Sequence, residues 1–126
     1  MATATSAATP YQTVIEVDHH SLLSDTSWQD KGGDSGPKPS QLLDASLASC
    51  IAMTVRIAAD ARGVALEQVI VEVTHTAEVD HTDFHCSLTL IGDLTEKQRA
   101  GLHRVAHRCP VSKALQNTVN IGIELR

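Results

Sequence analysis

Hydrophobic and polar residues alternate near the start of the chain as they do in β-strands. Residues 11–17 are rich in β-formers and partly alternate, and residues 19–23 have a similar pattern, so we expect two strands there. Residues 25–39 contain three glycines and two prolines, which predicts a loop. Residues 1–10 are rich in Ala and Thr and are expected to form a short disordered tail.

One long helix is expected over residues 39–62. Pro39 suits the first helical position, neither Gly nor Pro follows before Gly63, and Gly63 suits the left-handed residue after a helix end. Apolar and small residues recur every three or four positions, which predicts a buried face. That face consists of Leu43, Leu47, Cys50, Thr54, Ile57 and Ala61. A helix of this length is expected to be central in a small protein.

The second half of the chain predicts a hairpin followed by two helices and a strand. Residues 69–79 and 84–91 alternate and are separated by a polar turn, as in an antiparallel pair. Thr95 and Gln98 form a capping-box pattern for a helix to about His107. A short helix follows from Cys109-Pro110, and residues 119–125 alternate as a closing strand. The order of elements predicts one α+β domain over residues 11–126.

Composition adds a hint of a second subunit. The chain has 126 residues and a mass of 13.5 kDa, which is enough for one domain. Hydrophobic residues make up 42%, yet the only aromatic residues are Tyr11, Trp28 and Phe84. Since aliphatic side chains bury less area than aromatic rings do, this composition is a first hint that a second subunit completes the core.

Charge and cysteine content narrow the classes of function. The net charge of −5 and the pI of about 5.7 disfavour nucleic acid or an anionic membrane as a partner. No segment is expected to supply the roughly 20 apolar residues of a membrane span, and residues 1–10 lack the features of a secretory signal. Three cysteines are too few for a disulfide scaffold. We therefore expect a soluble, cytoplasmic protein with reduced thiols.

The three cysteines differ in their predicted surroundings. Cys109 precedes Pro110 at a helix start, where free N–H groups favour a thiolate, and Arg108 and His107 add positive charge. Taken alone, this position fits a functional thiol and a structural cysteine equally well. Cys50 lies on the predicted buried face of the long helix, where a cysteine is either a small core residue or a functional thiol. Cys86 lies in an alternating strand and is interpreted as a packing residue.

A metal site is the main alternative chemistry. His103, His107 and Cys109 follow the pattern H-x3-H-x-C, and two histidines four residues apart on a helix can share a metal ion. No C-x2-C pair accompanies them, and Pro110 indicates a helix junction beside Cys109. Paired carboxylates and a phosphate-binding P-loop are absent from the sequence. We therefore expect no metal or other cofactor, and keep a metal or redox sensor as an alternative.

Two segments of the chain together resemble one protein family. The first is GGDSGPKPSQLLDASLASCIAMT, which contains Cys50, and the second is LTEKQRAGLHRVAHRCPVSKAL, which contains Cys109. A Gly-rich loop, a long helix with a cysteine followed by Ala-Met-Thr, and a later Cys-Pro-Val are similar to the OsmC/Ohr family of osmotically inducible and organic hydroperoxide resistance proteins. The resemblance extends over the chain beyond residue 10.

The resemblance implies a fold, an assembly and a reaction. It implies antiparallel sheets around a long central helix that bears the cysteine, in an intertwined homodimer with active sites at the subunit interface. It implies reduction of organic hydroperoxides without haem, flavin or metal. By position, Cys50 matches the peroxidatic cysteine and Cys109 the resolving cysteine, and an external dithiol would reduce their disulfide.

Two activating residues of the family's peroxidases have no match. These are an Arg in an early strand and a Glu near the start of the cysteine helix, whereas here residues 1–50 contain no Arg and the helix-start position is Ser40. The chain looks more like the shorter OsmC branch, and the candidate activators are Arg108, His107 and Lys113. The alternatives are a non-catalytic dimer that binds small molecules or lipids, and a redox or metal sensor that uses Cys109 with His103 and His107.

Overall fold

The computed structural model describes residues 1–126 as an α+β protein with two antiparallel sheets and three helices. The chain divides into two compact units, Met1–Leu43 and Asp44–Arg126. The single domain expected over residues 11–126 stays a prediction.

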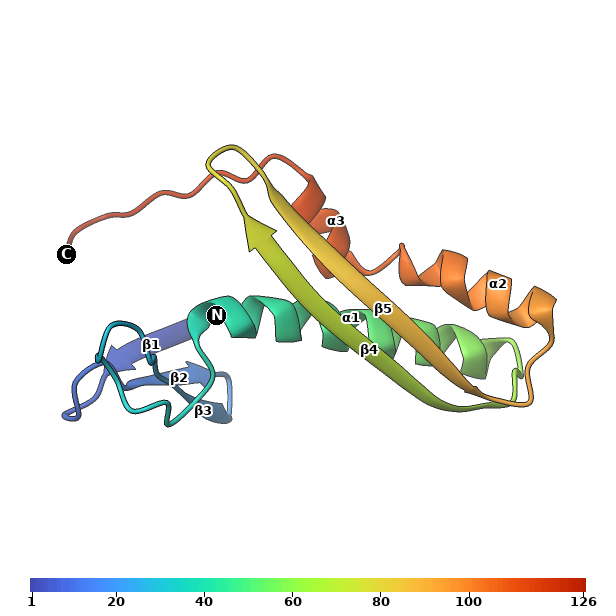
Figure 1. Ribbon diagram of the computed structural model, residues 1–126, viewed down its shortest axis with the longest axis horizontal. Helices are drawn as coiled ribbons and strands as arrows, with labels where there is room; N and C mark the ends of the chain where they lie inside the picture. Colours follow the sequence, from blue (N-terminus) through green and yellow to red (C-terminus); the bar gives the residue numbers. More distant parts are fainter. The chain divides into compact units, whose positions relative to one another are not determined.

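The first unit contains a three-stranded antiparallel sheet (Figure 1). Its strands are β1 (Ala2–Ser6), β2 (Thr13–Val17) and β3 (His20–Ser24), with β2 in the middle. The expectation of a disordered tail over residues 1–10 is wrong, because β1 pairs with β2 from Ala2 opposite Val17 to Ser6 opposite Thr13. The threonines of β1 favour a strand, and pairing satisfies backbone groups that β2 would otherwise expose at its edge.

A buried carboxylate organises the loop that follows β3. Asp25 is buried, and its side chain accepts backbone N–H bonds from Thr26 at 2.8 Å, Gly33 at 3.1 Å and Ser35 at 3.0 Å. Gly32 has a φ of +81°, and a Cβ there would stand 2.1 Å from the Thr26 carbonyl oxygen. The Gly-rich loop is therefore fixed by its own hydrogen bonds and close contacts.

The long helix α1 (Pro39–Ala61) has nearly the predicted bounds, and Gly63 has the predicted left-handed φ of +62°. Its buried residues are Leu47, Ile51, Val55 and Ala59. The predicted buried face is only partly right, since Ile57 is 68% exposed and Leu43 is also exposed. The helix is apolar on more than one side, so its periodicity alone does not select the stripe that packs within the chain.

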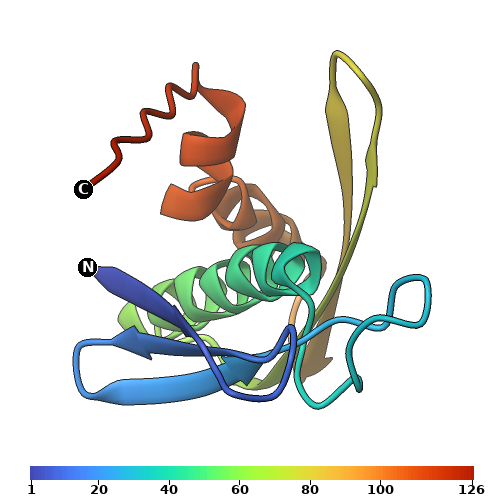
Figure 2. The same cartoon turned by 90° about the vertical axis from the view of Figure 1, so that its left-hand side faces the viewer.

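In the second unit, helices lie on one side of a long hairpin (Figures 1 and 2). The hairpin consists of β4 (Leu66–Ala77) and β5 (Thr82–Gly92). Helix α2 (Glu96–Ala106) has the predicted capping box of Thr95 and Gln98, and α3 (Pro110–Gln116) follows as predicted. The hydrophobic core combines residues of α1, the first residue of β4, one residue of α2 and the N-cap of α3: Leu47, Ile51, Val55, Ala59, Leu66, Leu102 and Cys109.

The chain ends in an extended segment without a sheet partner. Residues 117–126 form no strand, so the closing strand predicted over residues 119–125 is wrong for a single chain. The alternating residues Val119, Ile121, Ile123 and Leu125 are 61–100% exposed. A strand requires a neighbouring backbone to pair with, and this segment has none within its own chain.

The sequence led us to expect no segment that is long and apolar enough to span a membrane, but α1 is an exception. By length and composition alone, α1 would be able to cross a membrane, with a mean hydropathy of 1.5 over its most apolar window. The core helices of soluble proteins also meet this criterion, so it is weak evidence for a membrane span.

Candidate thiol site

The structure brings Cys50 and Cys109 together in the second unit. Cys50 lies half-buried on α1, and Cys109 is completely buried at the start of α3. The two thiols lie near enough to shift each other's pKa, and this lowers the pKa of Cys50 and raises the pKa of Cys109. Two cysteines far apart in sequence therefore form one local site, as the redox-pair hypothesis requires.

The first turn of α3 directs backbone N–H groups at both sulfurs. Cys109 is the N-cap residue, and its Sγ accepts a bond from the Ser112 N–H at 3.4 Å. Pro110 has no N–H, and the N–H of Val111 lowers the pKa of both Cys50 and Cys109. The N–H groups at this helix start that lack backbone acceptors therefore interact with thiol sulfur.

The pKa values of the two thiols shift in opposite directions. Burial alone would raise the pKa of Cys50, but hydrogen bonds from the Cys109 thiol, the Val111 N–H and the Thr54 hydroxyl bring it below its ordinary value. Burial raises the pKa of Cys109, and donation of its proton to Cys50 raises it further. The site therefore favours a thiolate at Cys50 and a protonated thiol at Cys109.

The residues predicted from the sequence as activators are not the ones that shift the pKa values of the two thiols. Arg108, His107 and Lys113 are exposed, and none is among the groups that shift the pKa of either thiol. The Thr54 hydroxyl instead lowers the pKa of Cys50, a role that the sequence analysis missed. The signal was its position four residues after Cys50, which places both side chains on one side of a helix.

Cys86 belongs to a different part of the molecule. It lies on β5 and is exposed, although burial of its thiol and the negative charge of Asp44 raise its pKa. Asp44 itself pairs with His75, at 2.6 Å between Oδ1 and Nδ1. Cys86 is thus a free thiol outside the Cys50–Cys109 pair, and it is less covered than the packing interpretation expected.

The residues of the alternative metal site do not converge. His103 and His107 lie exposed on and just after α2, with ring centroids 5.4 Å apart, whereas Cys109 is buried in the core. No group of three or more His, Cys, Asp or Glu side chains is arranged to hold a metal ion. The H-x3-H-x-C spacing does not become a ligand set because the chain turns into the core between His107 and Cys109.

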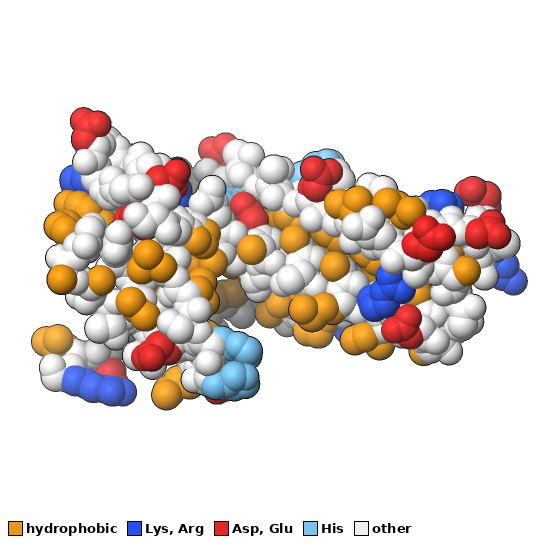
Figure 3. Space-filling view, turned by 90° about the horizontal axis from the view of Figure 1, so that it is seen from below, with side chains coloured by type: hydrophobic (Ala, Val, Ile, Leu, Met, Phe, Trp, Pro, Cys, Tyr) orange, Lys and Arg blue, Asp and Glu red, His pale blue; other side chains and the backbone are white.

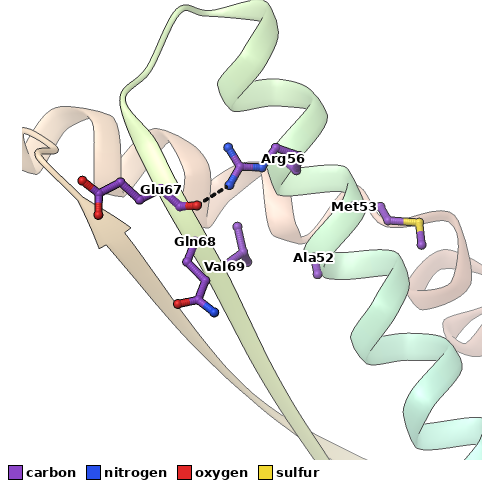
Figure 4. Close-up of a pocket in the computed structure, with 6 residues that line it drawn as sticks. All are labelled: Ala52, Met53, Arg56, Glu67, Gln68 and Val69. Atoms are coloured by element: carbon purple, nitrogen blue, oxygen red, sulfur yellow. Dashed lines mark hydrogen bonds between the residues drawn. The ribbon is translucent and has the colours of Figure 1, made fainter.

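A shallow, open depression of about 300 Å³ lies between α1 and β4 (Figure 4). The guanidinium of Arg56 donates to the backbone carbonyls of Leu66 at 2.7 Å and Glu67 at 3.1 Å, so it ties α1 to the start of β4. No cysteine lines this depression. Its lining residues are Ala52, Met53, Arg56, Glu67, Gln68 and Val69.

Comparison with solved structures shows the same fold in several proteins. The OsmC-like protein of Mycoplasma pneumoniae has 19% identity and a TM-score of 0.77, over 92% of this chain and 86% of that one. An organic hydroperoxide resistance protein of Elizabethkingia anophelis has 18% identity and a TM-score of 0.68, over 91% and 86%. OhrB of Bacillus subtilis, an organic hydroperoxide resistance protein, has 24% identity and a TM-score of 0.60, over 100% and 96%.

The sequence itself identifies the family. No curated protein matches it. The family model of OsmC-like proteins, however, matches residues 32–124, which include the Gly-rich loop and both paired thiols. The chain therefore belongs to the OsmC-like protein family.

Proposed function

We propose that this protein reduces organic hydroperoxides with Cys50 as the attacking thiol and Cys109 as the resolving thiol. The observation that carries the proposal is the proximity of the two thiols, which lowers the pKa of Cys50 and raises the pKa of Cys109. Family membership and structural neighbours that are hydroperoxide resistance proteins support the same chemistry.

The reaction follows from the different protonation of the two sulfurs. The Cys50 thiolate attacks the peroxide, an S–O bond forms as the O–O bond breaks, and the alkoxide leaves as alcohol after it takes a proton. The Cys109 sulfur then attacks Cys50, the S–S bond forms, and the hydroxyl leaves with a proton as water. An external dithiol restores both thiols by exchange and becomes a disulfide itself. This cycle requires reduced thiols, which fits the reducing cytoplasm.

We further propose that the protein works as an intertwined homodimer. All the buried hydrophobic residues lie beyond Leu43, so the first unit has no buried hydrophobic residue of its own. Met53 and Ile57 on α1 are exposed, as are the alternating residues of the C-terminal segment. Figure 3 shows hydrophobic side chains exposed among polar ones on the molecular surface. We propose that a second copy of the chain covers these exposed residues and pairs with the C-terminal segment, because it carries the same exposed residues and the same unpaired segment.

Turnover assays on matched variants test the peroxidase proposal. Reduced protein is mixed with cumene hydroperoxide and a dithiol, and peroxide loss is followed for wild type, Cys50→Ser, Cys109→Ser and Cys86→Ser. We expect Cys50→Ser to lose at least about 100-fold in rate because the nucleophile is gone, whereas Cys86→Ser keeps wild-type turnover. Wild type turning over no faster than Cys50→Ser would contradict the proposal.

A further inference from the structure

We infer that α3 responds to the redox state of the thiol pair: formation of the Cys50–Cys109 disulfide releases the first turn of α3 and opens the buried disulfide to the external dithiol. The inference rests on the proposed function, because it concerns the oxidised form in the same catalytic cycle. It assigns to α3 a conformational role between oxidation and reduction.

The first turn of α3 depends on thiol sulfur as a hydrogen-bond acceptor. The Ser112 N–H donates to Cys109 Sγ at 3.4 Å, and the Val111 N–H lowers the pKa of both thiols. The next N–H, that of Lys113, bonds the backbone carbonyl of Cys109 at 3.1 Å. Since Pro110 offers no N–H, Val111 and Ser112 carry the two N–H groups of this turn that lack a backbone acceptor, and both act on the thiol pair.

Little else holds this turn in place. Helix α3 spans only Pro110–Gln116 and contains no fully buried residue, although Val111 and Leu115 pack against the core. Helices this short are not stable on their own in water. The loss of an N-cap acceptor typically destabilises a helix start enough to change its opening equilibrium about five-fold.

Disulfide formation changes both acceptors at once. The sulfurs must approach to about 2.05 Å with a Cβ–S–S–Cβ dihedral near 90°, which draws Cys109 Sγ toward Cys50 and away from its own helix. The Cys109 S–H bond and the negative charge on Cys50 both disappear, and a neutral disulfide sulfur is a weaker acceptor than a thiolate. The N–H groups of Val111 and Ser112 then lose sulfur as an acceptor and bond to water instead.

Release of the first turn of α3 gives the external dithiol access to the buried Cys109 sulfur. Cys109 is completely buried when reduced, whereas Cys50 is half-buried, so a dithiol that attacks the Cys109 sulfur needs this turn to open. Opening at Pro110–Gln116 uncovers the disulfide from the side of α3. Reduction restores the two acceptors, and the turn closes again.

Hydrogen exchange with mass spectrometry tests the inference. Cys86→Ser protein, which retains only the paired thiols, is compared in its reduced form and after oxidation with diamide, which makes the disulfide without peroxide. We expect amides of residues 112–116 to exchange about five-fold faster or more in the oxidised form, while β4 and β5 are unchanged. Equal or slower exchange of residues 112–116 in the oxidised form would overturn the inference.

A matched variant separates the disulfide from general effects of the oxidant. Cys109→Ser in the same background cannot form the disulfide, and its hydroxyl can still cap α3, so diamide should leave its exchange unchanged. Faster exchange in treated Cys109→Ser, or failure of diamide to link Cys50 with Cys109, also overturns the inference. Release of α3 without peroxide turnover would refute only the proposed function, and turnover with α3 protected would refute only the inference.

Discussion

At the scale of single residues, the site distinguishes two thiols by the hydrogen bonds that they make. Interactions with Cys109, Val111 and Thr54 lower the pKa of Cys50, whereas burial and the interaction with Cys50 raise the pKa of Cys109. The first arrangement favours negative charge on sulfur and the second opposes it. Neither requires an arginine beside the thiol, and the nearest residues in sequence to Cys109, Arg108 and Pro110, are both exposed.

Alkylation rates test this assignment. In Cys86→Ser protein we expect iodoacetamide to label Cys50 before Cys109, with a pKa for Cys50 below that of an ordinary thiol. Thr54→Val removes one donor and should slow labelling at neutral pH about 2- to 10-fold by raising the pKa of Cys50. Peptide mapping over a pH series gives both results, and faster labelling of Cys109 would contradict the assignment.

Asp25 predicts a specific dependence of stability on pH. Backbone bonds from Ser35 and Thr26 chiefly lower the pKa of this carboxyl, so its ionised form is favoured in the folded state. Its stabilising contribution is fully present above the pKa of an unfolded Asp, and is lost as pH falls through the lower, folded value. Urea unfolding at several acidic pH values should show this loss.

Asp25→Asn provides the matched test. Both carboxylate oxygens of Asp25 accept N–H bonds, and an amide must turn an NH₂ group toward one set of donors. We expect lower stability at neutral pH and a weaker dependence on pH than in wild type. The exposed Asp34→Asn serves as the control and should behave as wild type. An unchanged pH dependence in Asp25→Asn would argue against this role.

At the scale of elements, local chemistry predicted the helices and the hairpin well. Pro39, Gly63 and the Thr95 capping box are signals within a few residues of the ends that they mark. Packing partners are not encoded locally, which is why the buried stripe of α1 and the pairing of β1 escaped prediction. The segment over residues 119–125 has a strand pattern but no neighbour within the chain.

Substitution of two isoleucines on α1 tests which face of the helix stabilises the fold. Ile51 is 6% exposed and Ile57 is 68% exposed, so the same substitution has different consequences at the two positions. Ile51→Ala should cost about 2–5 kcal/mol of unfolding free energy because it leaves a cavity. Ile57→Ala should cost less than about 1 kcal/mol at low protein concentration. Denaturant titration measures both, and equal losses would contradict the packing described for α1.

At the scale of the whole molecule, the unpaired C-terminal segment is a test of the proposed dimer. Ile121 and Ile123 share one side of an extended chain, and Asn120 lies on the other. Light scattering on wild type should give twice the chain mass of 13.5 kDa. The double substitution Ile121→Lys and Ile123→Lys should shift the protein toward the monomer, whereas Asn120→Lys should not. A monomeric wild type would contradict the dimer.

The sequence predicted the thiol site through resemblance and missed its local donors. The two segments around Cys50 and Cys109 indicated a redox pair, and these thiols lie near enough to shift each other's pKa. The donors Thr54 and Val111 were not identified, because hydrogen bonding depends on how α3 meets α1. Neighbours in sequence such as His107 and Lys113 proved to be exposed.

Treatment of the reduced Cys86→Ser protein with one equivalent of cumene hydroperoxide tests the central claim most directly. Mass spectrometry of the digested protein should find Cys50 linked to Cys109 by a disulfide. In Cys109→Ser, a sulfenic acid should instead persist on Cys50, where dimedone traps it. Peroxide that leaves Cys50 unmodified, or that oxidises Cys109 in the absence of a reactive Cys50, would contradict the account.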